Sequence, residues 1–362
     1  MTLKVKIIEM NIELDGQGVV NFNDGKDAAW REKERGYSPF SKINGNVKVA
    51  KKHLIAGVDA EGKATVTPEV FISSNKVRNM VFSDGANSDS LQTAINYSPK
   101  PIRNFLYGTA EALTRGWTAT SGGESAGLRK SAVCIPDARQ VAGALPSIEV
   151  QTTSGFKDSN SLTYVEQVGS IKYQVRKAAI DLSELSFLSG SDVMNRRGFD
   201  LDHVEIFRDS LKKTFGSEVA SLDYYTRTTS SSIVGEIGIK LNEEQVTRLV
   251  RFLFEKIAQA RVYNRSAYAE VVKISPTLIL EDNSKIVLGD LSPDEVVGKV
   301  ISALNKNPPL SSYEKASDKQ KQNSVDILAA MEHRKATSKE EKKAEKADKA
   351  AKTAKTKSAT PD

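Results

Sequence analysis

The chain has 362 residues, of which 39% are hydrophobic and 27% charged, and a formal net charge of +6. This length and composition are typical of a soluble globular protein with one large or two ordinary domains. No apolar run approaches the roughly 20 residues of a membrane span. The single cysteine excludes an internal disulfide framework. We expect a cytoplasmic protein without membrane contact, whose first residues form a strand rather than a signal peptide.

The positive charge is concentrated towards the C-terminal end. Residues 334–362 contain ten Lys or Arg and five Asp or Glu, which leaves 42 basic and 41 acidic residues for 1–333. The folded part is therefore nearly neutral, and nucleic acid would have to bind through local basic patches. Residues 339–357 are almost entirely Lys, Ala, Glu and Thr, so we expect them to be disordered or transiently helical.

The predicted elements mix strands and helices without an internal repeat. Strands are expected at 3–14, 45–50, 65–72, 171–180, 269–274 and 277–280, and a polar hairpin arm at 151–170. Helices are expected from Ser73 onward and at 101–114, 202–213, 243–262 and 293–305. This order predicts an α+β fold with antiparallel pairs and long insertions, because the helices are too few to cover a doubly wound sheet.

The residues that usually carry catalysis are sparse. The three histidines are isolated from one another and from Cys134, so no metal-ligand spacing is present. Cys134 follows two apolar residues and is expected to be a buried structural thiol. The segment 127–131 lacks the glycine that a P-loop has before its lysine, because that place is Arg129. We expect no catalytic residue, no metal and no cofactor.

The clearest candidate for binding is the start of the helix at Ser73. A short apolar run ends there, and Asn75, Lys76 and Arg78 follow. Hydroxyl and amide side chains satisfy the free N–H groups of a helix start, and that end of a helix attracts anions. The segment is therefore suited to a phosphate.

Three further segments combine basic and hydroxyl-bearing residues. They are 114–117 with Arg115, 128–131 with Arg129, Lys130 and Ser131, and 223–232 with Tyr225 and Arg227. Such groups neutralise phosphates or stack on bases. Each segment alone is more typical of a surface loop, whereas the four together favour a nucleic-acid-binding protein. The Gly-Phe-Gly-Phe consensus of sheet-stacking RNA readers is absent.

The chain resembles the repeated backbone subunit of CRISPR Cascade surveillance complexes, a member of the RAMP group, and most closely its version in the minimal variant of type I-F. The segments that carry the resemblance run in order: 14–22, 45–48, 71–78, 113–117, 129–131, 169–173, 225–238 and the helix through Arg261. They cover roughly residues 3–275. The pair of adjacent arginines expected near Tyr225 is here Arg227 followed by Thr228.

The resemblance implies a modified RNA-recognition-motif, or ferredoxin-like, core with long insertions that include a thumb-like hairpin. It implies that copies stack head to tail along a guide RNA (crRNA), forming a helical ribonucleoprotein for antiviral defence. The guide is then displayed for pairing with target DNA, and other Cascade subunits cap its 5′ and 3′ ends. We place the thumb in 153–170, the core domain in 1–310, and a linker with the Lys/Ala-rich tail in 311–362.

Carried over residue by residue, the resemblance implies RNA contacts from ten side chains. They are Ser73, Asn75, Lys76, Arg78, Arg115, Arg129, Lys130, Ser131, Tyr225 and Arg227. A salt bridge that fixes the turn is an equally good interpretation of Arg115. We expect Arg78→Glu with Arg129→Glu to weaken guide binding without unfolding the protein.

Other functions remain open at this stage. Backbone subunits of type III systems cut bound RNA through an Asp in the loop after the first strand, where Asp24 and Asp27 lie. Type IV systems use related backbone subunits. A structural filament or phage-type protein that binds no RNA is a further alternative.

Overall fold

The computed structural model describes residues 2–330, except 19, 21, 25–47, 51, 83–89, 120–126, 144–146, 155–159, 168, 192–197, 229–231 and 265–266. Helices and strands are mixed in an α+β arrangement, as the sequence predicts. No helix among the described residues combines the length and apolar character that crossing a bilayer requires.

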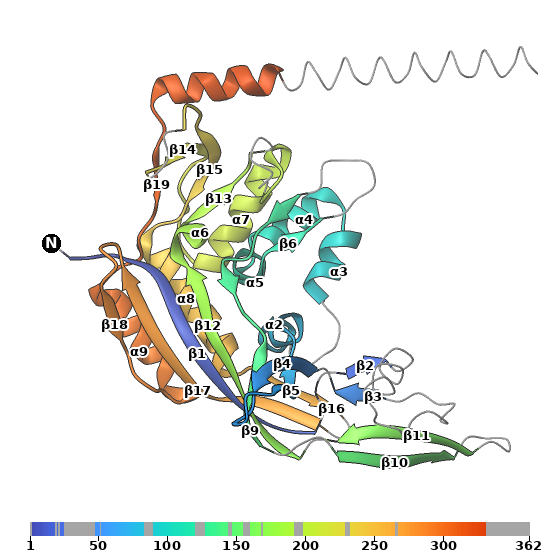
Figure 1. Ribbon diagram of the computed structural model, residues 1–362. Coiled ribbons are helices and arrows are strands. Elements are labelled where there is room, and N and C mark those ends of the chain that lie inside the picture. Colours follow the sequence, from blue (N-terminus) through green and yellow to red (C-terminus); the bar gives the residue numbers. More distant parts are fainter. Residues whose placement is uncertain are drawn as a thin grey trace, which may run out of the picture.

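A long antiparallel sheet forms the centre of the fold (Figure 1). Strand β1 (Val5–Gln17) lies between β17 (Ala267–Leu280) and β12 (Ser170–Asp181), and β12 pairs with β9 (Ala138–Gly143). Strands β5 (Ala64–Ile72) and β4 (Lys52–Val58) extend one edge, and β16 (Arg261–Asn264) closes the other. The short strands β8 (Val133–Cys134) and β18 (Lys285–Val287) pair with β12 and β17.

The alternation along β1 decides which face of the sheet meets the core. Ile8, Met10, Ile12 and Leu14 are buried, whereas the residues between them are at least partly exposed. Helices α8 (Glu243–Ala258) and α9 (Pro293–Lys306) pack against each other and both contact β17. The sheet therefore has one face covered by helices, as is common for antiparallel sheets.

Helix α8 confirms the strongest helix prediction. Asn242 accepts from the Gln245 N–H at 2.8 Å, and the Gln245 side chain accepts from the Asn242 N–H at 3.0 Å. This capping box satisfies two free donors of the first turn. The apolar side chains at the predicted core positions are buried. The helix ends at Ala258, four residues before the predicted end, because the chain enters β16 at Arg261.

Further helices and three small sheets complete the described structure. The helices are α2 (Ser74–Phe82), α3 (Ser90–Tyr97), α4 (Lys100–Tyr107), α5 (Ala110–Arg115), α6 (Leu182–Ser186) and α7 (Val204–Phe215), the last preceded by a 3-10 turn at Leu201–His203. One sheet has the order β13 (Phe187–Ser189), β15 (Glu236–Lys240), β14 (Asp223–Arg227), β19 (Tyr313–Lys315). Strands β6 (Trp117–Thr118) and β7 (Leu128–Arg129) form a second sheet. The third has the order β10 (Ser147–Ser154), β11 (Asn160–Gln167), β3 (Lys48–Ala50), β2 (Phe22–Asp24).

The predicted helix at 101–114 is two helices. Thr109 caps α5 by accepting from the Ala112 N–H at 3.4 Å, which starts a new helix after Tyr107. Gly108, at the break, lies so close to α7 that an added Cβ would be 2.7 Å from the Cβ of Ser210. The break is therefore a packing site for α7.

The two predicted strands at 269–274 and 277–280 are one strand, β17. It continues through Pro276, which pairs with Met10 of β1 and whose carbonyl accepts from the Leu288 N–H at 3.0 Å.

The prediction that Cys134 is buried is wrong. Strand β8 turns Val133 inward, so Cys134, the next residue, is exposed.

The structure also differs from the sequence analysis after residue 310. Residues 313–315 form β19, and residues 318–330 form a helix. The Lys/Ala-rich segment 339–357 lies outside the described residues.

The polar arm is a hairpin in which β10 pairs with β11 from Ser147 opposite Gln167 to Ser154 opposite Asn160.

Candidate nucleic-acid interface

The start of helix α2 holds an anion, and that anion belongs to the chain itself. The Ser74 N–H donates to Asp137 Oδ1 at 2.6 Å, and Asp137 Oδ2 lies 3.1 Å from His53 Nε2. The His53 ring is stacked on Phe71 with the ring centroids 3.8 Å apart. A carboxylate at a helix start is favourable for the same reason that a phosphate is. The sequence analysis missed Asp137, because it lies 63 residues from Ser74 and carries no local signal.

The predicted residues of α2 differ in how accessible they are. Asn75 is exposed, whereas Ser73, Lys76 and Arg78 are half-buried. Burial lowers the pKa of the Lys76 ammonium. The Arg78 guanidinium donates to the backbone carbonyl of Arg115, which joins α2 to the end of α5.

Arg115 lies in a closed environment at the end of α5. The residue is 7% exposed, and its Nη1 is 3.4 Å from Glu111 Oε1 one turn earlier. Its guanidinium also lies over the Phe82 ring, 5.8 Å from the centroid. Both contacts fit the interpretation in which Arg115 fixes the turn that leads to Gly116.

Arg129 is buried and donates to three backbone carbonyls. Its Nε donates to Leu113 O at 2.9 Å, and its two terminal nitrogens donate to Phe187 O at 3.3 Å and Glu184 O at 3.2 Å. Burial lowers its pKa to about 10, so the guanidinium is still charged at neutral pH. In the free chain this cation connects α5, α6 and β13.

Lys130 and Ser131 follow Arg129 and have different surroundings. Lys130 is exposed. The Ser131 hydroxyl donates to Val133 O at 3.0 Å and lies 3.3 Å from Thr114 O. Lys130 is therefore a cation that can reach a phosphate without a change in the fold.

Tyr225 and Arg227 lie on β14, between β15 and β19. Tyr225 is 4% exposed and contacts the Phe187 ring edge-to-face, with the centroids 5.5 Å apart. Burial raises the pKa of the Tyr225 hydroxyl. Arg227 Nη2 lies 2.6 Å from Glu184 Oε1, and its Nε donates to the Tyr313 hydroxyl at 2.9 Å.

Four of the predicted arginines therefore belong to one connected set, which we call the arginine network: Arg78, Arg115, Arg129 and Arg227. Arg78 bonds the Arg115 carbonyl, Arg129 bonds the neighbouring Leu113 carbonyl, and Glu184 joins Arg129 to Arg227. These residues come from segments that lie far apart in the sequence. The structure brings them together, with Lys130 and Asn75 as the exposed members of the predicted site.

Other predicted elements lie outside this network. Asp24 is the last residue of β2, and Asp27 falls outside the described residues. The hairpin of β10 and β11 belongs to the separate sheet with β3 and β2. Within the described part of the chain, no three His, Cys, Asp or Glu side chains are grouped so that they could hold a metal.

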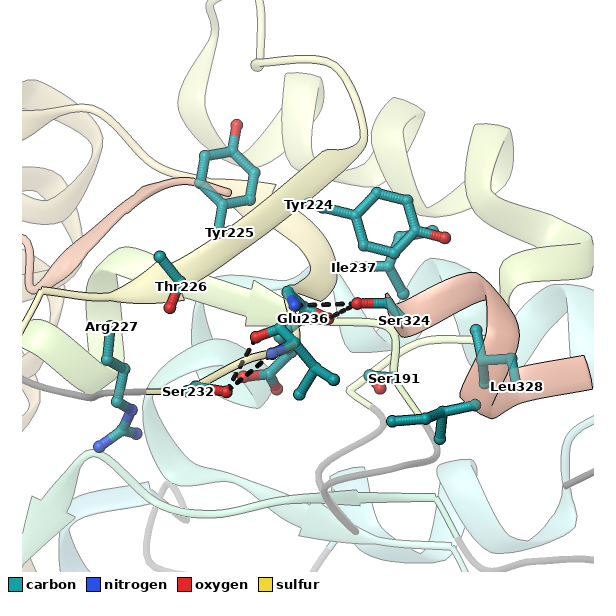
Figure 2. Close-up of a pocket in the computed structure, with 13 residues that line it drawn as sticks. Ser191, Tyr224, Tyr225, Thr226, Arg227, Ser232, Glu236, Ile237, Ser324 and Leu328 are labelled. Carbon is teal, nitrogen blue, oxygen red and sulfur yellow. Dashed lines mark hydrogen bonds between the residues drawn. The ribbon is translucent and has the colours of Figure 1, made fainter. Parts of the chain in front are cut away.

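A cavity of about 80 Å³ lies beside the network, between β14–β15 and the helix at 318–330 (Figure 2). Its lining residues include Tyr224, Thr226, Val234, Ile237, Ile327 and Leu328. The Thr226 side chain is 7% exposed, and its hydroxyl has no hydrogen-bond partner among the described residues.

Comparisons with known proteins add little to this geometry. No protein-family model and no curated protein sequence matches the chain. Among solved structures, a chain of a structure titled "Type IV-B CRISPR Complex" is similar over 64% of this chain and 90% of its own length. The sequence identity is 12% and the TM-score 0.24. A TM-score of this size does not establish a shared fold.

Proposed function

We propose that the chain is a non-catalytic guide-RNA-binding backbone subunit of a CRISPR surveillance complex. In this role copies associate head to tail along a crRNA and present it for pairing with target DNA, while other subunits cap the two ends of the RNA. The sequence resemblance favours the minimal variant of type I-F, and a type IV complex is the alternative within the same role. The arginine network is the observation that carries this proposal.

The order of elements in the main sheet supports a modified RNA-recognition-motif core. The four strands β17, β1, β12 and β9 are neighbours in that order, and all three pairs are antiparallel. Along the chain these strands follow in the order β1, β9, β12 and β17. Helices α2 to α5 lie between β1 and β9, and α8 lies between β12 and β17. This is the βαββαβ order of a ferredoxin-like fold.

The charges support binding to an RNA backbone rather than to a base sequence. Residues 1–333 are nearly neutral overall, yet four arginines, Lys76 and Lys130 are concentrated around α2, α5 and β14. An exposed cation such as Lys130 can neutralise a phosphate and help to fix the register of a nucleic acid without reading its sequence. A subunit that binds any guide sequence needs this property.

The test is assembly on RNA of defined length. The protein is purified alone and with repeat-spacer RNAs of increasing length, and size exclusion with mass determination and 260/280 nm absorbance is recorded. We expect an RNA-containing assembly whose mass grows in regular steps with RNA length. A monodisperse, RNA-free protein that is indifferent to RNA would contradict the proposal and favour a filament or phage-type role.

Two variants make the test specific. Lys130→Glu reverses an exposed cation beside the arginine network, and Lys299→Glu reverses an exposed cation on α9. We expect weaker RNA binding for the first variant and unchanged binding for the second.

Metal-dependent cleavage of bound RNA that is lost in Asp24→Ala or Asp27→Ala would replace the non-catalytic role by the type III-like one.

A further inference from the structure

Residues 311–330, which we call the C-terminal strap, cover β14 and one side of the cavity. Strand β19 is the edge strand of its sheet and pairs with β14 through Tyr225–Lys315, Thr226–Glu314 and Arg227–Tyr313. The strap helix lies on the loop at 232–235. Its Gln320 and Asn323 side chains donate to Ser232 O at 2.8 Å and Ile233 O at 2.7 Å. These contacts are mostly polar, and Val325 on the helix is 47% exposed.

The contact between the strap helix and β14–β15 is incompletely packed, whereas Tyr313 of β19 is buried against Phe187 and Tyr225. The cavity of about 80 Å³ lies between them, with Ile327 and Leu328 of the strap on one side and Ile237 of β15 on the other. Atoms that line a void lose their dispersion contacts. The Thr226 hydroxyl is buried in the same contact without a partner in the described structure, which destabilises the closed arrangement. Figure 2 shows this hydroxyl on the side of β14 that faces Ser232.

The surface beneath the strap has the chemistry of a nucleic-acid contact. Tyr224 offers an aromatic ring, Thr226 a hydroxyl and Arg227 a guanidinium, all on one short strand. Aromatic rings stack on unpaired bases, and hydroxyl and guanidinium groups donate to phosphates. In the closed arrangement the strap residue Tyr313 accepts the hydrogen bond of Arg227 Nε.

The closed strap covers Thr226, because only 7% of this residue is exposed. The cavity beside it is about 80 Å³, whereas a buried cavity that binds benzene is about 150 Å³. A nucleobase is larger than benzene. Contact with the Thr226 hydroxyl therefore requires the strap helix to move away from the sheet.

We propose that the C-terminal strap is displaceable and that single-stranded RNA takes its place on β14. Tyr224 then stacks on a base, while the Thr226 hydroxyl and the Arg227 guanidinium contact phosphate. This inference rests on the proposed RNA-binding function and adds Tyr224 and Thr226 to the contacts that the sequence suggests. It also gives residues 311–330 a role, since the strap competes with RNA for β14.

A glycine under the strap allows the closed state to be weakened in the full chain. A Cβ at Gly235 would lie 2.8 Å from the Cβ of Ala316 in the strap and 3.2 Å from that of Tyr224. Gly298 on α9 is the matched control, because a Cβ there has no described atom within 4 Å. We expect Gly235→Ala to bind single-stranded RNA about threefold more tightly or better, since affinity rises with the open fraction. Hydrogen exchange across 311–330 should rise as well, and Gly298→Ala should change neither quantity.

A disulfide allows the closed state to be locked. Thr228 and Ser312 face each other across β14 and β19, with the Thr228 N–H donating to Ser312 O at 2.9 Å. Facing residues of antiparallel strands have the Cα separation that a disulfide needs. In a Cys134→Ser background, the Thr228→Cys, Ser312→Cys protein should bind RNA more weakly when oxidised. A reductant should restore the affinity of the same sample.

The outcomes separate this inference from the proposed function. If the wild-type chain binds RNA, and neither Gly235→Ala nor oxidation of the cysteine pair changes the affinity, the strap is a fixed part of the fold and the inference is overturned. If no form of the chain binds RNA, both the inference and the proposed function fall. If Gly235→Ala unfolds the chain, the RNA affinities of the oxidised and reduced Thr228→Cys, Ser312→Cys protein alone test the inference.

Discussion

Arg129 and Lys130 are neighbours in sequence, and their surroundings differ at the scale of single residues. Arg129 is buried and satisfies three carbonyls, whereas Lys130 is exposed. We expect Arg129→Met to lower the free energy of unfolding by about 3 kcal/mol or more, because buried carbonyls lose their donors. Lys130→Met should change it by less than about 0.5 kcal/mol. Urea unfolding of both variants measures the difference.

The same contrast changes the expectation for the double variant Arg78→Glu, Arg129→Glu. The sequence suggests that it stays folded, but a carboxylate in the Arg129 cavity would face three carbonyl oxygens. We therefore expect loss of stability together with loss of RNA binding. Equal unfolding free energies for Arg129→Met and Lys130→Met would contradict the structural role of Arg129.

Gly116 fixes the contact between the end of α5 and the segment after β7. Its φ is +71°, and a Cβ there would lie 2.5 Å from Arg129 O and 2.6 Å from Ser131 N. Gly62 has a similar φ of +78° with no described atom near its Cβ position. We expect Gly62→Ala to cost about 1 kcal/mol from backbone strain alone, and Gly116→Ala to cost at least about 2 kcal/mol more. Thermal and urea unfolding compare the pair, and similar costs would show that the close approach at Gly116 relaxes freely.

At the scale of elements, local signals were sufficient for some predictions and not for others. Helix α8 was predictable because its cap, acidic first turn and apolar spacing all lie within the helix. The break between α4 and α5 has a local cap in Thr109, but its close approach to Ser210 of α7, about 100 residues away, has no local signal. For the site, the sequence indicated which basic segments belong together. Whether each cation is exposed depends on long-range contacts that no local pattern records.

The strap is anchored by an ion pair whose pH dependence follows from its geometry. Asp223 carboxylate oxygens lie 3.0 Å from Lys315 Nζ and 3.2 Å from Lys321 Nζ. The hydrogen bond from Lys315, followed by that from the Tyr224 N–H, lowers the pKa of Asp223 to about 2 from its ordinary 3.8. Because the pKa is lower in the folded state, the carboxylate stabilises the fold above pH 3.8, and this contribution is lost as the pH falls towards 2.

Asp223→Asn tests this dependence. We expect the variant to be less stable than the wild-type chain between pH 5 and pH 7 and the difference to shrink as the pH falls from 3.8 to 2. Chemical unfolding of both proteins across this range gives the difference directly. A difference that stays constant down to pH 2 would show that the anchor does not depend on the charge of Asp223.

At the scale of the whole molecule, the charge is divided between a nearly neutral fold and a basic end. Residues 1–333 carry 42 basic and 41 acidic side chains, and residues 334–362 carry ten and five. The strap helix is described as far as residue 330, and its Ile327 and Leu328 line the cavity beside β14, so the basic residues follow in sequence soon after a segment that covers the surface that we assign to RNA. The fold would then supply oriented contacts, and the basic end would add positive charge.

Salt dependence distinguishes these two contributions. Each phosphate that a protein neutralises on a single strand contributes about 0.7 to the slope of log affinity against log salt concentration. Removal of residues 334–362 eliminates ten cations, so we expect the slope to fall by at least about 2 for single-stranded RNA. A chain whose residues 334–362 are shuffled, with composition unchanged, should keep the original slope, because charge rather than sequence is responsible. Equal slopes for the full and shortened chains would mean that residues 334–362 make no phosphate contacts.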